Sequence, residues 1–277
     1  MTAIAPTAIP LTWLYVPGDR PQVIEKALSA GADVVIVDLE DAVAPDRKAY
    51  ARAAAAELLA DPLSTPVHVR VAVEDDVLAV AGLPGLAGLR LPKITDARQV
   101  RRVAGLAPGV GLHPLLESAL GVEHAYAIAT AHPAVRGIAL GEADLCADLG
   151  VRDESGLDWP RSRIVVAARA AGLAPPVQSV YRHISDLAGL AASCARGRSL
   201  GFLGRAAIHP AQLPVIERAY LPPPAEVAAA EEVLSAAPTD TGALALADGR
   251  FVDAAVVEAA RRTLALSRRD PPPHPVP

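Results

Sequence analysis

Residues 34–41 have the sequence VVIVDLED, which is the most informative stretch of the chain for predicting its fold. Its run of β-branched residues is typical of a strand that is buried on both faces. The run ends abruptly in three carboxylates, Asp38, Glu40 and Asp41. Burying like charges together is costly unless cations, hydrogen bonds or a metal ion compensate, so the cluster indicates either a structural network or a functional site.

Similar hydrophobic runs recur along the chain, with helical patterns between them. We expect eight strands, at residues 12–16, 34–39, 67–71, 88–91, 111–116, 135–140, 176–180 and 201–208, the last with an internal break. Helices are expected at residues 21–30, 46–60, 96–107, 121–131, 160–171 and 186–200, whereas the third and fourth strands are separated by a weak, glycine-rich helix at best. This alternation predicts an α/β fold, a (β/α)8 TIM barrel, with a doubly wound sheet as the alternative.

The barrel is expected to occupy residues 1–220, and residues 221–277 form a separate C-terminal helical extension. The extension holds two helical patterns, at 224–236 and 254–266, joined by a connection rich in Thr, Asp and Gly. Its proline-rich end is expected to be frayed. We interpret the extension as a lid or as an oligomerisation segment that packs on a neighbouring subunit.

Composition excludes several classes of partner. The 26 basic and 31 acidic residues are spread through the 277-residue chain without a long block of either sign, which argues against nucleic acid as a partner. Residues 1–10 are apolar but lack a basic start, and no apolar run reaches the roughly 20 residues that span a membrane. Cys146 and Cys194 have no metal-binding spacing and make a weak case for a disulfide. We therefore expect a soluble, cytoplasmic protein.

In a barrel of this kind, side chains at the C-terminal ends of the strands converge on one face. Glu117 follows the fifth strand and Asp144 follows the sixth, with Gly141 between them allowing close backbone approach. Two carboxylates suit Mg²⁺, which prefers oxygen ligands and keeps positions for water or substrate. Alternatively, Glu117 caps the helix near Ser118 and Asp144 caps the helix that follows. Spacing alone leaves both interpretations open.

Cationic side chains follow other strands. Arg70 ends a valine-rich strand and presents a guanidinium suited to two-point capture of a carboxylate, although a salt bridge to the acidic cluster is the simpler interpretation. Lys93 follows the fourth strand without a signal for a depressed pKa, and His209 before a proline is explained by the barrel's final turn. Arg20, in the first loop, could reach an anion. The acidic cluster at 38–41 could ligate a metal directly or support it from an outer shell.

Six short phrases in this order resemble the citrate lyase β-subunit-like family of acyl-CoA lyases, within the wider HpcH/HpaI aldolase group. They are residues 13–21 (WLYVPGDRP), 37–43 (VDLEDAV), 91–93 (LPK), 116–119 (LESA), 141–145 (GEADL) and 207–210 (AIHP). The resemblance runs from about Leu11 to Leu266. It implies a (β/α)8 barrel, usually oligomeric, that binds Mg²⁺ and cleaves or forms a carbon–carbon bond between a 2-oxo acid and an acyl thioester.

By motif match, the resemblance also implies roles for individual residues. Glu117 and Asp144 would bind the metal, and Glu40 and Asp41 would lie in the outer shell around its water as further catalytic residues. Arg70 would hold the substrate carboxylate. The remaining implied substrate-binding residues are Pro17, Arg20 and Lys93.

The C-terminal phrase at residues 249–253 (GRFVD) carries a further implication. In relatives that act on CoA esters, an Asp from the C-terminal segment of a neighbouring subunit works in the site, and Asp253 holds the matching position. Asp253 is therefore our candidate acid or base. A homotrimer or hexamer is the oligomer that the resemblance favours.

Some positions depart from the family pattern, among them Ala72 in place of Asn, Val23 in place of Arg and Arg205 in place of Lys. They leave the metal pair and Arg70 intact and bear on the acyl carrier. The first hypothesis is a Mg²⁺-dependent lyase acting on malyl-, citramalyl- or citryl-CoA. Hydrolysis of the same thioester is the second, and a β-subunit that needs an acyl-carrier partner, as in a citrate lyase complex, is the third.

Overall fold

The computed structural model describes residues 9–237, 244–246 and 248–269. The chain divides into two compact units. The larger unit comprises residues 10–217, and the smaller one contains Ile9 and the described residues from Arg218 onward. Within the described residues, none of the helices has the length and apolar character needed to cross a membrane.

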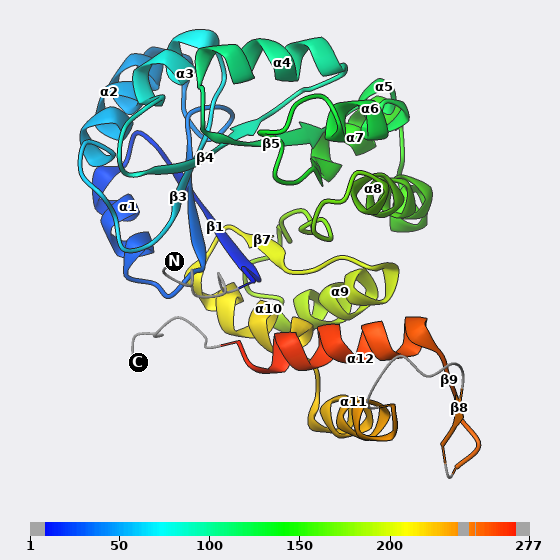
Figure 1. Cartoon of the computed structure of the whole chain (residues 1–277). Helices are drawn as coiled ribbons and strands as arrows, with labels where there is room; N and C mark the ends of the chain where they lie inside the picture. Colours follow the sequence, from blue (N-terminus) through cyan, green and yellow to red (C-terminus); the bar gives the residue numbers. More distant parts are fainter. Residues whose placement is uncertain (1–8, 238–243, 247, 270–277) are drawn as a thin grey trace, which may run out of the picture. The chain divides into compact units, whose positions relative to one another are not determined.

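The larger unit is built on a curled, parallel sheet of seven strands (Figure 1). The strand order is β6-β5-β4-β3-β2-β1-β7, so neighbours in the chain are neighbours in the sheet from β1 to β6. The strands are β1 Thr12–Pro17, β2 Val34–Asp38, β3 Val67–Arg70, β4 Leu86–Leu91, β5 Gly111–Leu116, β6 Ala139–Leu140 and β7 Arg205–Ala207. The curl and the alternation with helices are those of an incomplete TIM-like barrel.

The predicted strand at 176–180 is wrong as a ladder strand, because only one isolated bridge forms there, between Gln178 and Arg205. Pro175 and Pro176 precede this bridge and have no N–H group to donate to a ladder. The predicted sixth strand is also shortened, from 135–140 to Ala139–Leu140. Gly137, which interrupts it, has no side chain to pack and weakens a strand.

A side chain spans the gap that these two short segments leave. The hydroxyl of Ser179 donates a hydrogen bond to the carbonyl oxygen of Leu140 at 2.5 Å and accepts one from the N–H of Glu142 at 3.2 Å. On its other side, the same segment bonds through its backbone, since the N–H of Gln178 donates to the carbonyl of Gly204 at 3.0 Å. Residues 176–180 therefore connect β6 to β7 without a continuous ladder.

Helices follow the strands much as the sequence predicts. They are α1 Pro21–Leu28, α2 Lys48–Leu58, α3 Glu74–Val80, α4 Ala97–Leu106, α5 Ala119–Glu123, α6 Ala125–Ala129, α7 Glu142–Leu149, α8 Asp158–Ala170, α9 Leu187–Leu200 and α10 Leu213–Tyr220. The α4 start is fixed by a capping box between Asp96 and Gln99. The expectation of only a weak helix between β3 and β4 is wrong, because Asp76 accepts the N–H groups of Ala72 and Val73 and fixes the start of α3.

Small aliphatic side chains fill most of the core of the larger unit. Inside the curl of the sheet, Trp13, Val34, Ile36 and Ala206 form a buried cluster. Strand β2 is buried along its whole length, which explains its continuous hydrophobic run. The core thus holds the strands rigidly and fixes where their C-terminal ends lie.

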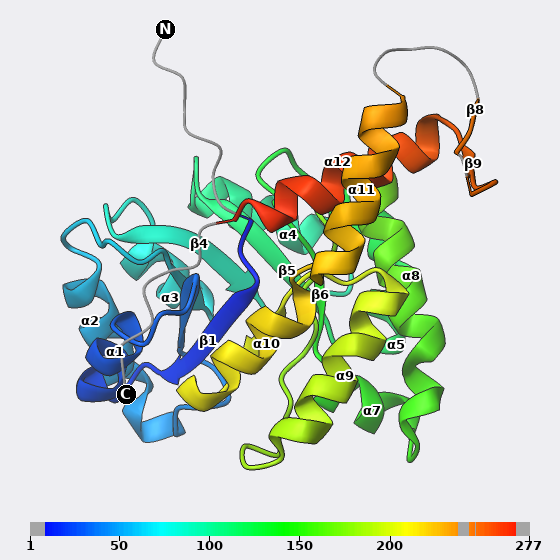
Figure 2. The same cartoon turned by 90° about the horizontal axis from the view of Figure 1, so that it is seen from below.

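The smaller unit contains two helices, α11 Pro224–Ala236 and α12 Ala254–Ser267, and a short antiparallel pair, β8 Leu244–Ala245 with β9 Phe251–Val252. The two helices pack on each other (Figure 2) through Ala230 and Val233 on one and Ala260 and Leu264 on the other. Its role as a lid or oligomerisation segment stays a prediction. The proline-rich tail from residue 270 lies outside the described residues.

Candidate active site

A cavity of about 950 Å³ opens at the C-terminal ends of the strands in the larger unit. Parallel strands end at the same edge of a sheet, so polar side chains from several loops meet there. We call it the central cavity. Its polar lining includes Tyr15, Asp38, Asp41, Arg70, Arg90, Glu117, Asp144, Gln178, Ser179 and Arg205.

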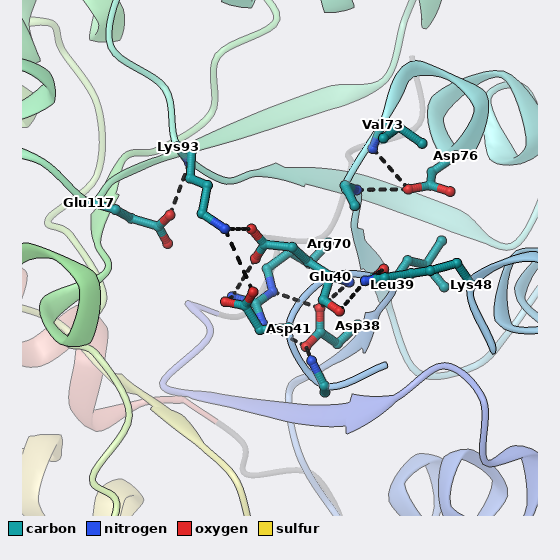
Figure 3. A network of polar contacts seen from close by, with 12 residues as sticks. Asp38, Leu39, Glu40, Asp41, Lys48, Arg70, Val73, Asp76, Lys93 and Glu117 are labelled. Atoms are coloured by element: carbon teal, nitrogen blue, oxygen red, sulfur yellow. Dashed lines mark hydrogen bonds and ion pairs between the residues drawn. The ribbon is translucent and has the colours of Figure 1, made fainter. Parts of the chain in front are cut away.

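Asp38 and Arg70 lie directly opposite each other on β2 and β3. The guanidinium of Arg70 donates to both carboxylate oxygens of Asp38, at 2.7 Å from Nε and 2.6 Å from Nη2 (Figure 3). Burial alone would lower the pKa of Arg70, but the hydrogen bonds and charge of Asp38 outweigh burial and raise it. The salt bridge considered from the sequence is therefore present, and Asp38 holds one edge of the guanidinium.

Glu40 lies between two cations. Its Oε1 accepts a hydrogen bond from Nζ of Lys93 at 2.6 Å, and its Oε2 lies 3.0 Å from Nη1 of Arg70 as an ion pair. The pKa of Glu40 is nevertheless raised, because its burial outweighs the effect of these cations. Asp41 is more exposed and stands farther off, 3.6 Å from Lys93 and 3.9 Å from Arg70. Glu40 is thus a buried member of the network and Asp41 a peripheral one.

Lys93 connects the acidic cluster of β2 to the carboxylate after β5. Its backbone N–H donates to Oε2 of Glu117 at 3.0 Å, while its side chain reaches Glu40 (Figure 3). Lys93 has a φ of 56°, and no other described non-glycine residue has a positive φ. A left-handed residue of this kind is uncommon and marks a position that the surroundings impose. The hydrogen bond to Glu40 is the main cause that raises the pKa of Lys93.

Glu117 is the buried carboxylate of the cavity, with 5% of its surface exposed. Its pKa is raised to about 7, first by burial and then by the negative charges of Glu40 and Asp144. The backbone of Gly141 comes so close that a Cβ atom there would clash with Cγ and Oε1 of Glu117. The close approach predicted for Gly141 is therefore present, and Glu117 lines the central cavity together with Asp144.

Asp144 lies in the first turn of α7 and lines the same cavity. The capping alternatives are not what the structure shows. Ser118, rather than Glu117, accepts the N–H of Gly121 and caps α5, and no described group hydrogen-bonds the side chain of Asp144. The adjacent Glu142 is engaged elsewhere, in a two-point pair with Arg161 at 2.8 and 2.7 Å.

The donor set around Glu117 suits a hard cation. No three His, Cys, Asp or Glu side chains among the described residues converge as a complete metal-ligand set. A cation between Glu117 and Asp144 would therefore take its other ligands from water and substrate, which is how Mg²⁺ is usually bound. Raised pKa and repulsion between neighbouring carboxylates are what such a cation relieves.

The other residues singled out from the sequence are placed differently. Pro17 lines the central cavity, whereas Arg20 is exposed at the start of α1 and is not part of the lining. His209 accepts the N–H of Ala211 at 3.1 Å, which agrees with a turn-forming role. Asp253 belongs to the smaller unit, where its carboxylate accepts the N–H of Val256 and caps α12. The catalytic role of Asp253 stays a prediction.

The structure adds cavity residues that sequence reasoning missed, above all Tyr15 on β1 and Arg90 on β4. Arg90 interrupts an otherwise apolar strand, LAGLRL, and this charged residue in a buried run was the available signal. Its register partner on β3 is Arg70. Residues paired in this way point to the same face of a sheet, so Arg90 could have been placed inside from the register.

A family model and similar proteins of known function match this chain over most of its length. A family model described as HpcH/HpaI aldolase/citrate lyase matches residues 11–210. A (3S)-malyl-CoA thioesterase of Cereibacter sphaeroides is 38% identical over 91% of this chain and 92% of its own length. An L-malyl-CoA/β-methylmalyl-CoA lyase of Rhodobacter capsulatus is 30% identical over 92% of this chain and 94% of its own length.

Among solved structures, the CitE protein of Mycobacterium tuberculosis in complex with magnesium, acetoacetate and coenzyme A is similar to this chain. The two share 34% sequence identity with a TM-score of 0.78, over 95% of this chain and 99% of that one.

Proposed function

The chain belongs to the HpcH/HpaI aldolase/citrate lyase family, and on that premise we propose that it is a Mg²⁺-dependent carbon–carbon lyase. Its substrate would be a short hydroxyacyl-CoA thioester such as malyl-, citramalyl- or citryl-CoA, cleaved into a 2-oxo acid and an acyl-CoA or formed from them. The magnesium, acetoacetate and coenzyme A bound to the similar CitE protein support this choice.

One observation carries the proposal, namely the buried Glu117 carboxylate beside Asp144 in a cavity that also holds guanidinium groups. These are oxygen donors alone, as Mg²⁺ prefers, with space left for substrate oxygens. The raised pKa of Glu117 shows that its negative charge is poorly compensated by the protein itself. A divalent cation supplies that compensation.

The expected reaction has three requirements. The hydroxyl proton leaves, the carbon–carbon bond breaks to give the 2-oxo acid and a thioester enolate, and the enolate takes up a proton. Bound Mg²⁺ would lower the pKa of the hydroxyl and neutralise the adjacent carboxylate. Arg70, fixed along one edge by Asp38, would turn its remaining N–H groups to the substrate carboxylate and orient it. Glu40 and Lys93 would hold Glu117 and Arg70 in place.

We assign the acid or base to Asp253 of a second subunit, which makes the working form an oligomer, a homotrimer or hexamer. A complementation experiment tests this assignment. Co-expressing an Asp253→Asn chain with a Glu117→Gln chain should restore part of the activity that each lacks, because a mixed oligomer then has one intact site. If Asp253 acts within its own chain, the mixture stays as inactive as either variant alone.

Thioester hydrolysis is a second candidate, favoured by the 38% identity to a (3S)-malyl-CoA thioesterase, which exceeds the 30% identity to the lyase. Products distinguish the two reactions. A lyase converts malyl-CoA into glyoxylate and acetyl-CoA, whereas a thioesterase gives malate and free CoA. Liquid chromatography measures acetyl-CoA, the product of the lyase reaction, and a thiol reagent measures free CoA, the product of hydrolysis.

The main experiment incubates the full chain with malyl-, citramalyl- and citryl-CoA, with Mg²⁺ or with EDTA. We expect turnover of at least one substrate that EDTA abolishes. Glu117→Gln should lower activity by at least about 100-fold and remove Mg²⁺ binding in calorimetry, because one of two protein ligands is lost. The exposed Glu123→Gln is the matched control and should behave as the wild type. Absence of turnover across the panel, or indifference to EDTA, would contradict the proposal.

A further inference from the structure

Arg90 is a buried cation without an anion. It is 3% exposed, it lines the central cavity, and no described residue accepts a hydrogen bond from its guanidinium or forms an ion pair with it. Its Nε is fully buried and has no partner. Isolated charges in such surroundings are costly, so the chain would not keep one there without a compensating group.

The neighbours of Arg90 do not neutralise it. Its guanidinium stacks 4.5 Å from the ring centroid of Trp13, which satisfies a face of the group but none of its N–H donors. His68 and His113 lie in contact with Trp13, and burial lowers the pKa of both well below its ordinary value, so they add no negative charge. The donors of Arg90 that face the cavity remain available.

Arg90 and Arg70 are register partners, yet their situations differ. Arg70 has its Nε and Nη2 on Asp38 and its Nη1 close to Glu40. Two neighbouring guanidinium groups repel each other, and this repulsion reinforces the effect of burial in lowering the pKa of Arg90. Arg70 therefore has protein carboxylates as partners, whereas Arg90 has none among the described residues.

Tyr15 adds a hydroxyl group to the cavity that this second cation lines. Its ring lies under Arg70, with 5.2 Å from the guanidinium carbon to the ring centroid, and it lines the same cavity. Burial raises the pKa of Tyr15, so its hydroxyl keeps the proton and can donate a hydrogen bond. A guanidinium and a phenol that line the same cavity offer donors suited to a carboxylate.

We propose that Arg90, with Tyr15, binds a second carboxylate of the substrate, distinct from the one beside the metal ligands, and so selects thioesters of acids with an additional carboxylate. The inference rests on the proposed function and narrows its substrate class. The additional carboxylate belongs either to the 2-oxo acid half, as in oxaloacetate, or to the acyl half, as in malonyl-CoA. A substrate that yields only glyoxylate or pyruvate and acetyl-CoA leaves Arg90 unpaired.

Calorimetric titration in the presence of Mg²⁺ tests the proposal without turnover. Two ligand pairs are compared, oxaloacetate with pyruvate and malonyl-CoA with acetyl-CoA. In the wild type, the member of one pair that carries the additional carboxylate should bind about 10- to 100-fold more tightly, the range expected for hydrogen bonds to a charged group. Arg90→Met should abolish that preference and leave the affinity for the other ligand of the pair unchanged, because Met keeps the apolar stem and removes the donors.

Two further variants complete the test. Arg90→Lys retains the charge and should keep part of the preference, and the exposed Arg101→Met on α4 should keep all of it. Arg90→Met should fold at least as stably as the wild type, because it removes an unpaired buried charge. Urea unfolding of each variant checks this.

The outcomes separate this inference from the function on which it rests. A preference within either pair that Arg90→Met removes supports the inference and identifies the half of the substrate that carries the carboxylate. Binding of both members of both pairs with equal affinity, or a preference that survives in Arg90→Met, overturns the inference and leaves the lyase assignment standing. If neither pyruvate nor oxaloacetate binds with Mg²⁺, the proposed function itself fails.

Discussion

Arg70 and Asp38 stand opposite each other on neighbouring strands and form a two-point ion pair, with distances of 2.7 and 2.6 Å. Asp38 also accepts the N–H groups of Glu40 and Ala42, so both of its oxygens are engaged twice. One carboxylate therefore fixes the Arg70 guanidinium and the loop that carries Glu40 and Asp41. The end of β2 and the loop after it are therefore held together by one side chain.

Replacing Asp38 by Asn should destabilise the protein by about 3 kcal/mol. The change leaves the Arg70 guanidinium without its carboxylate, and it places the NH₂ group of Asn close to N–H donors that Asp38 accepts. Urea unfolding measures the change. The exposed Asp46→Asn serves as the control and should lie within about 0.5 kcal/mol of the wild type. An Asp38→Asn protein with wild-type stability would show that the pair contributes no net energy.

Glu40 and Asp41 should differ in their effect on Mg²⁺ binding. Glu40 is buried and hydrogen-bonds Lys93, whose N–H in turn binds Glu117, so Glu40→Gln should weaken Mg²⁺ binding by about 10- to 100-fold. Asp41→Asn should change it by less than about threefold, because Asp41 is exposed and farther from both cations. Calorimetry with Mg²⁺ checks the order, and a larger effect at Asp41 would reverse our assignment.

Gly141→Ala should impair the metal site without removing a ligand. The added Cβ would clash with Cγ and Oε1 of Glu117, so the carboxylate must move. We expect a loss of Mg²⁺ affinity of at least about tenfold with little loss of stability, since φ at Gly141 is −96° and any residue can adopt it. Gly105→Ala, in α4 with open space around its Cβ, is the control and should retain full Mg²⁺ affinity.

Acid should destabilise the larger unit through His68. Burial, and then the charge of Arg90, lower the pKa of His68 to about 3, whereas the unfolded chain titrates near its ordinary value of about 6.5. Between these values the unfolded chain binds more protons, so the free energy of unfolding falls as the pH drops, by about 1.4 kcal/mol per pH unit for one such site.

Urea unfolding of the wild type and of His68→Gln isolates this contribution. The measurements run from about pH 4 to about pH 8, a range that includes the ordinary histidine pKa of about 6.5. The difference in stability between the two proteins should shrink as the pH falls below about 6.5. The exposed His132→Gln should run parallel to the wild type. Parallel curves for His68→Gln would mean that His68 is not the group that titrates.

Much of the larger unit could be predicted because its strands are buried on both faces and read as continuous apolar runs. The run at 34–39 became β2 Val34–Asp38, and the run at 111–116 became β5 with the same bounds. The segment at 176–180 has an equally strand-like sequence, yet Pro175 and Pro176 lack N–H groups and the Ser179 hydroxyl makes the contact to β6 instead of a ladder. Hydropathy cannot show which backbone groups find a partner.

The site divides in a similar way. The order of strand ends was enough to bring Glu117 and Asp144 to one cavity, because parallel strands impose that convergence. The order of strand ends could not decide whether Arg70 pairs with a protein carboxylate or stays open to a ligand. That depends on the register of β2 and β3, which places Asp38 opposite Arg70. Arg90 was missed because a charge inside an apolar strand gives no sign, in sequence alone, that it lacks a partner.

The connection from Ser179 to Leu140 and Glu142, which we call the Ser179 joint, has an evolutionary consequence. A single base change removes a donor from a backbone ladder only when it introduces proline, because every other residue type carries the same N–H and C=O groups. The joint at Ser179 depends on a single hydroxyl that touches Leu140 and Glu142, just before α7 and its Asp144. A substitution of this one residue would therefore remove both side-chain hydrogen bonds between residues 176–180 and the β6–α7 region, while the backbone of the other strands stays unchanged.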